Sequence, residues 1–329
     1  MPRFTNFPGG ITSLGIPTFG TGIVPPFTGN YFFVEENASI GAGVSGGAGT
    51  AQSPFNTIQQ ALNAAVAGNN DVIFLIGTVH VSSTQGSILW NKNNTHLVGL
   101  CSPMKRGKRA RISVTGTTGF NQLVLVTGTG CYFKNFQIFY GFPNTSGALV
   151  AWEDDGGRNT YELVEFLGFG DATASTGTAN LTGARAFKMN TSTGETTFRD
   201  CVFGPDTTVR NATNYTIEIA GGAPRLTFEN CDFESDLGAS GGASSHVLIG
   251  ADGIDRYCKF QGCTFMSATL SGGTAMTQAF NVNAAAGGVV MLDYSTNFGI
   301  TNWETTPSGS VFMNMPAVSA PGGGKMLVL

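Results

Sequence analysis

The chain has 329 residues, a formal net charge of −4 and a charged fraction of 12%, about half the usual level of about 25%. The apolar fraction of 41% excludes a disordered chain, and the negative balance excludes a nucleic-acid binder. The 47 glycines and frequent Phe favour many short strands joined by tight turns, because Gly tolerates corner conformations and Phe fills a pleated interior.

Residues 1–29 are predicted to form an extended arm. Their apolar residues are separated by Gly and Pro without any period, so the segment cannot build a core alone and is expected to dock on its own chain or on a neighbour. Arg3, Phe4 and Phe7 are the candidate contact residues of the arm. The opening shows no signal-peptide pattern, and no apolar run approaches the roughly 20 residues of a spanning helix. We therefore expect folding in a reducing cytoplasm and no membrane partner.

A helix is predicted at about residues 54–67, at the start of the main domain. Ser53 can serve as its N-cap and Pro54 as its first residue, and Gly68 fits just past its end. One apolar stripe contains Phe55, Ile58, Leu62 and Val66. The order strand, Gly-rich loop, helix and strand over residues 31–81 resembles the opening of pectate-lyase-like β-helices. The resemblance implies that the helix caps one end of a solenoid.

Five basic residues cluster between two expected strands: Lys105, Arg106, Lys108, Arg109 and Arg111. One interpretation is a solvated turn, which is the ordinary place for such a run. The other is a contact for an acidic partner surface. The first four residues of this cluster are candidate contacts with a partner or a second subunit.

A repeat of about thirty residues follows. The sequences FRDCVF, FENCDF and FQGCTF begin at residues 198, 228 and 260, which are 30 and 32 residues apart. FKNFQI at 133–138 is a weaker copy, and LVEF at 163–166 is degenerate. A second series runs in phase with the first. Its members are centred on Phe187, Ile217, Leu248, Phe280 and Phe312.

Two series with one period predict an all-β, single-stranded, right-handed parallel β-helix over residues 30–316. Each unit has short alternating apolar runs and no helical periodicity, which excludes helical and leucine-rich solenoids. Stacked coils lie about 4.8 Å apart, so equivalent side chains form ladders. Residues 317–329, which include PGGGKMLVL, are predicted to be a C-terminal tail.

The repeat explains most of the cysteines. Asn230 and its equivalents precede the Cys and accept a left-handed corner conformation, which places Phe228, Cys231 and Phe233 inside. Cys201, Cys231 and Cys263 then share one interior position, and Cys131 and Cys258 share another. A metal or disulfide site is the alternative, but the spacing is the repeat period and not that of a C-x-x-C motif. We expect no cofactor and no metal.

Polysaccharide-cleaving β-helices require a search for catalytic groups. Glu153, Asp154 and Asp155 form the only tight run of carboxylates, so Asp154 and Asp155 are the alternative catalytic residues if the protein is an enzyme. The ordinary role of such residues is to cap backbone N–H groups in turns. The three His residues, 80, 96 and 246, lie far apart in sequence. Trp90, Trp152 and Trp303 are the aromatic candidates for a carbohydrate groove.

The opening PRFTNFPGGITSLGIPTFG, followed by TGNYFFVEENASIGAG, resembles the start of a group of tailed-phage virion proteins with an arm before a right-handed β-helix. This resemblance implies a non-enzymatic capsid decoration, or cement, protein that binds the phage head surface as a homotrimer. Its partners would be the major capsid protein and other head proteins. The alternative is a tailspike or fibre β-helix that binds or depolymerises host polysaccharide.

Overall fold

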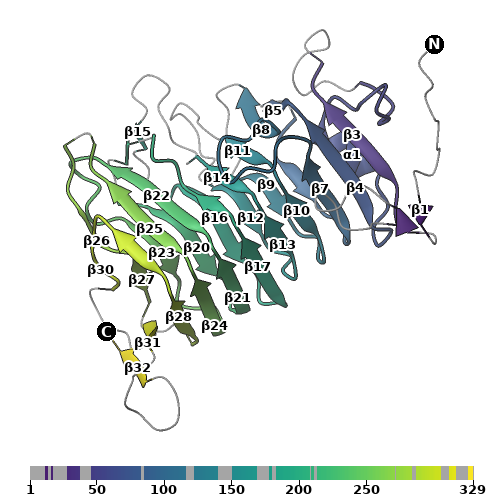
Figure 1. Ribbon diagram of the computed structural model, residues 1–329. Coiled ribbons are helices and arrows are strands. Elements are labelled where there is room, and N and C mark those ends of the chain that lie inside the picture. Colours follow the sequence, from purple (N-terminus) through teal and green to yellow (C-terminus); the bar gives the residue numbers. More distant parts are fainter. Residues whose placement is uncertain are drawn as a thin grey trace.

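A computed structural model of the chain describes residues 28–37, 46–82, 85–115, 122–139, 150–168, 183–207, 209–210, 213–270, 272–283 and 287–304. It also places short strands within 12–17, 178–179, 311–315 and 325–328. These residues wind into a parallel β-helix in which strands of successive coils stack side by side (Figure 1). The predicted contact residues Arg3, Phe4 and Phe7 lie outside the described residues.

Three sheets run along the solenoid. Sheet 1 contains, in spatial order, β3 (Tyr31–Glu35), β4 (Asp71–Ile76), β7 (Thr95–Gly99), β10 (Tyr132–Lys134), β13 (Thr160–Glu162), β17 (Glu195–Arg199), β21 (Ala223–Glu229), β24 (Ile254–Gln261), β28 (Val289–Asp293), β31 (Val311–Met315) and β32 (Lys325–Val328). The pairs are parallel except that β31 and β32 run antiparallel. This sheet follows the whole length of the described solenoid.

Sheet 2 contains β5 (Thr78–Ser82), β8 (Arg111–Thr115), β11 (Gln137–Phe139), β14 (Glu165–Leu167), β18 (Val202–Phe203), β22 (Asp232–Leu237), β25 (Thr264–Ala268) and β29 (Thr296–Phe298), with β15 (Thr178–Ala179) and β19 (Val209–Arg210) beside β22. Sheet 3 contains β6 (Ile88–Trp90), β9 (Gln122–Val126), β12 (Val150–Asp154), β16 (Arg185–Asn190), β20 (Tyr215–Ala220), β23 (Ser245–Ile249) and β27 (Phe280–Val282). Two small pairs are β1 (Thr12–Ser13) with β2 (Ile16–Pro17) and β26 (Met276–Gln278) with β30 (Ile300–Asn302).

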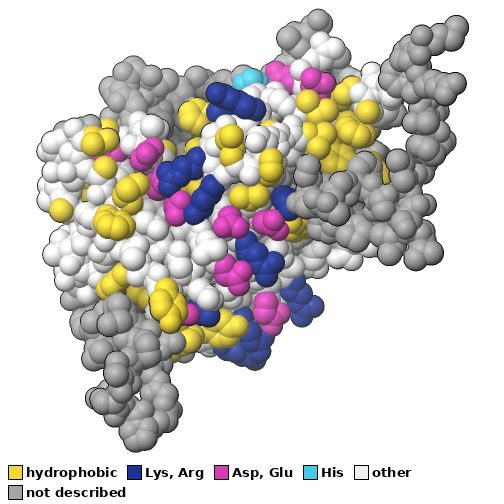
Figure 2. All heavy atoms as spheres, in the orientation of Figure 1, with side chains coloured by type: hydrophobic (Ala, Val, Ile, Leu, Met, Phe, Trp, Pro, Cys, Tyr) yellow, Lys and Arg dark blue, Asp and Glu magenta, His cyan; other side chains and the backbone are white. Residues whose placement is uncertain are grey.

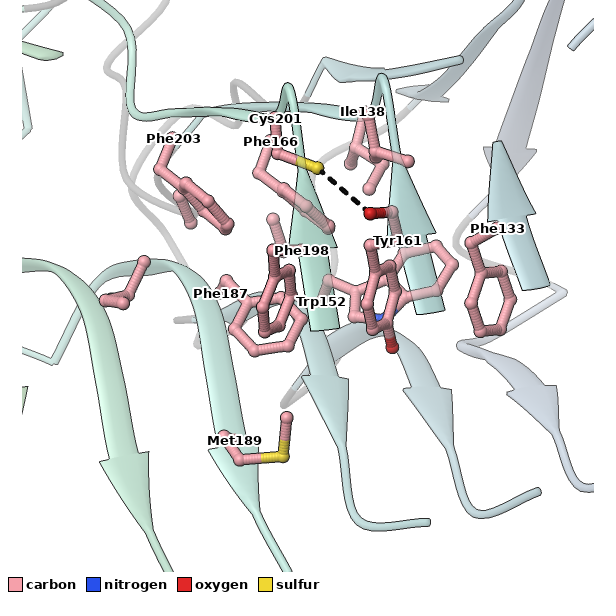
Figure 3. Packing of buried hydrophobic residues seen from close by; sticks show 14 of the residues in the cluster. Phe133, Ile138, Trp152, Tyr161, Phe166, Phe187, Met189, Phe198, Cys201 and Phe203 are labelled. Atoms are coloured by element: carbon pink, nitrogen blue, oxygen red, sulfur yellow. Dashed lines mark hydrogen bonds between the residues drawn. The ribbon is translucent and has the colours of Figure 1, made fainter. Parts of the chain in front are cut away.

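Aromatic ladders fill the interior, as the repeat predicts. On sheet 1 the rings of Phe133, Tyr161, Phe198, Phe228 and Phe260 stack, with centroids 4.9, 4.9, 4.5 and 4.6 Å apart along the series. Figure 3 shows the first three of these rings lying parallel. Adjacent coils are 30 residues apart where Arg199 pairs with Glu229. Stacking therefore follows from the period, because each coil places the same residue type over its neighbour.

The second predicted series forms sheet 3, with two corrections. Phe187, Ile217 and Phe280 occupy one column, but the residue in line with them in β23 is Val247 and not Leu248. The last predicted member, Phe312, lies in β31 of sheet 1, where it pairs with Met291. A one-residue shift reverses the face of a strand, so the series member centred on Leu248 is one residue out of register with its column.

The corners adopt the predicted conformation. Asn135, Asp200 and Asn230 have φ of 59°, 50° and 52°, and the corner at Leu163 shows that LVEF is a true copy, with φ of 54°. Phe228, Cys231 and Phe233 are buried, as expected. Each stacked thiol donates to a backbone carbonyl one coil earlier, as Cys201 does to Tyr161 at 3.6 Å (Figure 3). All six cysteines are free thiols.

The capping helix α1 (Ile58–Ala64) is shorter than the predicted 54–67. It begins late because Phe55 pairs with β3 as a strand residue: its N–H donates to the Phe33 carbonyl at 2.8 Å, and its carbonyl accepts from Glu35 at 2.9 Å. Thr57 is therefore the N-cap, and its hydroxyl accepts from the Gln60 N–H at 3.2 Å. The predicted stripe holds for Ile58 and Leu62, while Val66 is exposed.

The outer face of sheet 1 changes character along the solenoid. At its N-terminal end Val72, Phe74 and Val98 form a second apolar cluster, separate from the interior core, and Tyr31 and Phe33 pack against it. Further along, the same outward columns carry charges that pair between coils, such as Lys134 with Glu162 at 2.8 Å and Arg199 with Glu229 at 2.8 Å. Figure 2 shows acidic and basic side chains interspersed over the visible face. Within the described residues, no helix is long and apolar enough to cross a membrane.

Candidate functional site

The sequence-derived catalytic candidates lie at the end of β12. Asp154 is fully buried, and its carboxylate accepts bonds from the Gly156 and Gly157 N–H groups at 2.9 and 3.0 Å and from the Tyr161 hydroxyl at 2.7 Å. Burial raises the pKa of Asp154, while its hydrogen bonds act in the opposite direction. These contacts close a turn, and together with the Asn159 side-chain amide they give both Asp154 oxygens hydrogen-bond donors from the same chain.

Asp155 is half-buried, and burial is also the main reason why its pKa is raised. Its neighbour Glu153 forms an ion pair with Lys188 at 3.0 Å. The described residues contain no group of three or more His, Cys, Asp or Glu side chains able to hold a metal ion. A catalytic role for Asp155 stays a prediction. Asp154 cannot act beside it as a second accessible carboxylate, because Asp154 is buried.

The tryptophans do not form a carbohydrate groove. Trp90 and Trp152 are fully buried and pack edge-on against the ring of Phe133, with centroids 5.1 and 5.0 Å away. Trp303 is half-buried against the end of the core. The expectation for Trp90 and Trp152 is wrong because both lie on the inner columns of sheet 3, where they fill the solenoid.

The basic cluster is part of a long connection between sheets 1 and 2, which we call the strap and define as residues 100–110. Other coils pass from sheet 1 to sheet 2 through a short corner such as Asn135–Phe136. The strap instead leaves β7, crosses the outer face of sheet 2 and returns to β8. Its contacts reach β14 and β22, and β22 is four strands from β8 in the sheet. At about 4.8 Å per strand, the strap therefore covers about 19 Å.

Lys108 anchors the strap. Its side chain and that of Glu165 are almost inaccessible, with 0% and 1% exposed, and its Nζ lies 3.0 Å from Glu165 Oε1. The Lys108 N–H donates to the same oxygen at 3.1 Å, and Gln137 Nε2 donates to Glu165 Oε2 at 2.8 Å. Burial lowers the pKa of Lys108, and the Glu165 carboxylate opposes that shift. Lys108 is thus unavailable for the surface contact predicted for it.

Lys105 and Arg106 hold the tip of the strap on β22. Lys105 Nζ lies 2.9 Å from Asp232 Oδ1 and donates to the Asn230 carbonyl at 2.7 Å. Arg106 donates to Asp232 Oδ2 at 2.8 Å and forms an ion pair with Glu234. Burial raises the pKa of Glu234, and the Arg106 charge opposes the shift. The acidic surface opposite these basic residues therefore belongs to the same chain, while Arg109 is exposed.

A cleft of about 240 Å³ lies between the strap and sheet 2. Its wall includes Arg106 from the strap, Phe139 from β11 and Glu234 from β22. The remaining lining residues are Gly107, Gln137, Glu165, Leu167, Val202, Pro205, Asp206 and Thr207. An aromatic ring, carboxylates, an amide and a guanidinium thus converge in one hollow.

Two features make this cleft suited to a polar ligand with apolar faces. Phe139 lies on the outer face of β11, and its ring is 50% exposed. Gln137 Oε1 is buried and has no hydrogen-bond partner among the described residues. A buried acceptor without a donor is costly. A ligand with an apolar face and a hydroxyl group could therefore pack on the Phe139 ring and donate to Gln137 Oε1. Sequence reasoning found the strap cations but missed Gln137, Phe139 and Glu165.

Comparison with known proteins establishes the fold. No family model matches the chain, and no curated protein matches it in sequence. A solved pectin methylesterase in complex with a hexasaccharide is 14% identical over 88% of this chain and 89% of that chain, with a TM-score of 0.56. Pectin methylesterase PemA from Erwinia chrysanthemi is 13% identical, with the same two coverages and a TM-score of 0.53.

These similarities assign the chain to the class of right-handed parallel β-helices, as the repeat predicts. At 14% and 13% identity, these similarities show the fold and do not show the activity. The resemblance to phage virion proteins stays a prediction.

Proposed function

We propose that the protein is a β-helix that binds polysaccharide in the cleft beneath the strap. The observation that carries the proposal is the half-exposed ring of Phe139 beside buried polar groups in a cleft on the outer face of sheet 2. A sugar has apolar C–H faces and a rim of hydroxyl groups. Sites for such ligands combine an apolar surface with a few placed polar groups that fix the orientation.

Each polar group has a defined role in this proposal. The unpartnered Gln137 Oε1 accepts a bond from a sugar hydroxyl, and the Glu234 carboxylate accepts another. Arg106 donates to a ring or hydroxyl oxygen. The solved pectin methylesterase with a bound hexasaccharide supports the ligand class, because it is a protein of the same fold in complex with an oligosaccharide.

Substitution of the aromatic ring tests the proposal. Phe139→Ala is expected to weaken binding of the best ligand on a panel of soluble oligosaccharides at least tenfold, measured by calorimetry, because it removes the apolar platform. Phe298→Ala is the matched control, since Phe298 is also exposed and lies on β29 of the same sheet but does not line the cleft. Equal affinities of the two variants, or no binding by the wild-type protein, would refute the site.

Depolymerisation is the enzymatic form of the same proposal. Glu234 is the cleft carboxyl suited to donate a proton, because burial raises its pKa. Incubation of a bound polysaccharide with the protein, followed by chromatography of chain length, separates cleavage from binding. Cleavage that Glu234→Gln abolishes assigns the activity to this cleft. Cleavage that Asp155→Asn abolishes assigns it to the end of β12 instead.

A second candidate function is a structural role in a phage virion, in which a homotrimer decorates the head and binds the major capsid protein and other head proteins. The outer apolar cluster of Val72, Phe74 and Val98 favours it, because the cluster lies on β4 and β7, next to the strand that follows the arm. Deletion of residues 2–29 is expected to abolish co-sedimentation with capsids. Full occupancy by the truncated protein would exclude this role for the arm.

A further inference from the structure

The anchor and the tip of the strap are held in different ways. The Lys108 anchor is closed to solvent on both sides of its ion pair. At the tip, the side chains of Lys105 and Arg106 are 33% and 49% exposed, although their partners Asp232 and Glu234 are only 16% and 4% exposed. Water and salt therefore weaken the tip contacts far more than the anchor.

Gly107 lies between the anchor and the tip. Its φ is +76°, a backbone conformation that residues with side chains rarely adopt. The nearest heavy atom to an added Cβ is Met104 Sδ at 4.0 Å, so the strap is not packed tightly at this point. A backbone without a side chain and without close neighbours can rotate while Lys108 stays in place.

We propose that the strap is a gate over the cleft, with Lys108 as its anchor, Gly107 as its hinge, and Lys105 and Arg106 as its latch. The inference rests on the proposed function of the cleft as a binding site and names the regulation of that site. In the closed form, Arg106 occupies the hydrogen-bonding capacity of Glu234 and Asp232. Opening frees both carboxylates, of which Glu234 lines the cleft, and ligand hydroxyls replace the guanidinium there.

The gate restricts ligands by competition. A ligand must offer enough donors to Glu234 and Asp232 to replace Arg106, because both carboxylates are mostly buried and leaving them unpaired is costly. A hydroxyl-rich sugar chain meets this requirement, whereas a purely apolar molecule does not. Higher ionic strength weakens the latch and is expected to speed association.

Hydrogen–deuterium exchange of the full chain, without ligand, tests the gate. In the variant Lys105→Gln/Arg106→Gln, the Met104 amide, which donates to the Ser102 carbonyl at 2.8 Å, is expected to exchange about tenfold faster than in the wild-type protein. The Lys108 amide, which donates to Glu165, is expected to keep its protection. Arg109→Gln is the control: it removes one positive charge from the strap, but Arg109 has no ion pair within the described part of the chain, so exchange stays within twofold.

Equal exchange in the latch variant and the control would overturn the gate, as would loss of Lys108 protection in the latch variant, since the strap would then have no fixed end. Oligosaccharide binding is measured on the same proteins. A latch variant that opens but binds no sugar upholds the gate and refutes the proposed ligand. If the wild-type protein binds the sugar but the strap of the latch variant stays protected from exchange, the gate is refuted and the binding site is not.

Discussion

The buried pair of Lys108 and Glu165 makes a strong prediction about stability. Lys108→Met removes the ammonium and leaves the Glu165 carboxylate 1% exposed without its counter-charge. Breaking a buried ion pair costs about 3–5 kcal/mol. Two donors remain on the carboxylate, the N–H of residue 108 and Gln137 Nε2, so we expect a loss of about 3 kcal/mol, at the lower end of this range.

The double variant Lys108→Met/Glu165→Gln separates lost attraction from the cost of a buried charge. Because no uncompensated carboxylate remains, the free energy of unfolding is expected to recover to within about 1 kcal/mol of the wild-type value. The assay is urea unfolding followed by the fluorescence of Trp90 and Trp152, which are buried in the core. Arg109→Met, at an exposed position of the same strap, is the control and is expected to change stability by about 0.5 kcal/mol or less.

Two results would refute this reasoning. A loss below about 1 kcal/mol for Lys108→Met would mean that the carboxylate reaches solvent or finds another donor. A double variant less stable than the single variant would mean that packing of the lysine stem, and not charge, holds the strap.

Three further predictions concern pH, a corner and the thiols. Burial lowers the pKa of His96 to about 4, against the opposing effect of Asp71, and its neutral ring accepts from the Tyr132 N–H at 3.1 Å. Because the folded pKa lies below the unfolded value of about 6.5, this contribution is complete above pH 6.5 and is lost as the pH falls toward 4, up to about 3 kcal/mol; urea unfolding of His96→Gln across this range should show a weaker acid dependence. Asn230→Ala should cost about 1–2 kcal/mol because φ is 52°, while thermal unfolding of Asn230→Gly stays close to wild type. Under native conditions a thiol reagent should modify Cys101 first, because the other five cysteines are buried; fast labelling of a second site, detected by mass spectrometry, would contradict the packing.

The solenoid could be predicted from sequence because its determinants are local and repeat. The Phe-x-x-Cys-x-Phe series specifies which residues face inward, and Asn230 with its equivalents specifies where the chain bends. The predictions were wrong where the repeat period does not tell which of two neighbouring residues lies in a column or which sheet a strand joins. The second series was centred on Leu248 where Val247 occupies the column, and Phe312 was assigned to the wrong sheet, since an alternating strand does not reveal which sheet it joins.

The cleft could be predicted only in part. The sequence shows that Lys105, Arg106 and Lys108 form a basic cluster, but their acidic partners lie 57 to 128 residues further along the chain. No local pattern encodes such distances. Trp152 was assigned to a groove because aromatic residues suit both sugars and cores, and only its position on β12, facing Phe133, separates the two. Alternation with the buried Ile138 places Phe139 on the outer face, but no local pattern shows that Arg106 of the strap lines the same cleft.

A crystal structure of the protein grown with the tightest-binding oligosaccharide tests the central claim most directly. The account predicts a sugar ring packed on Phe139, a sugar hydroxyl within hydrogen-bond distance of Gln137 Oε1, and Arg106 displaced from Glu234. A sugar bound elsewhere on the solenoid, with Phe139 free and Arg106 still paired with Glu234, would contradict it.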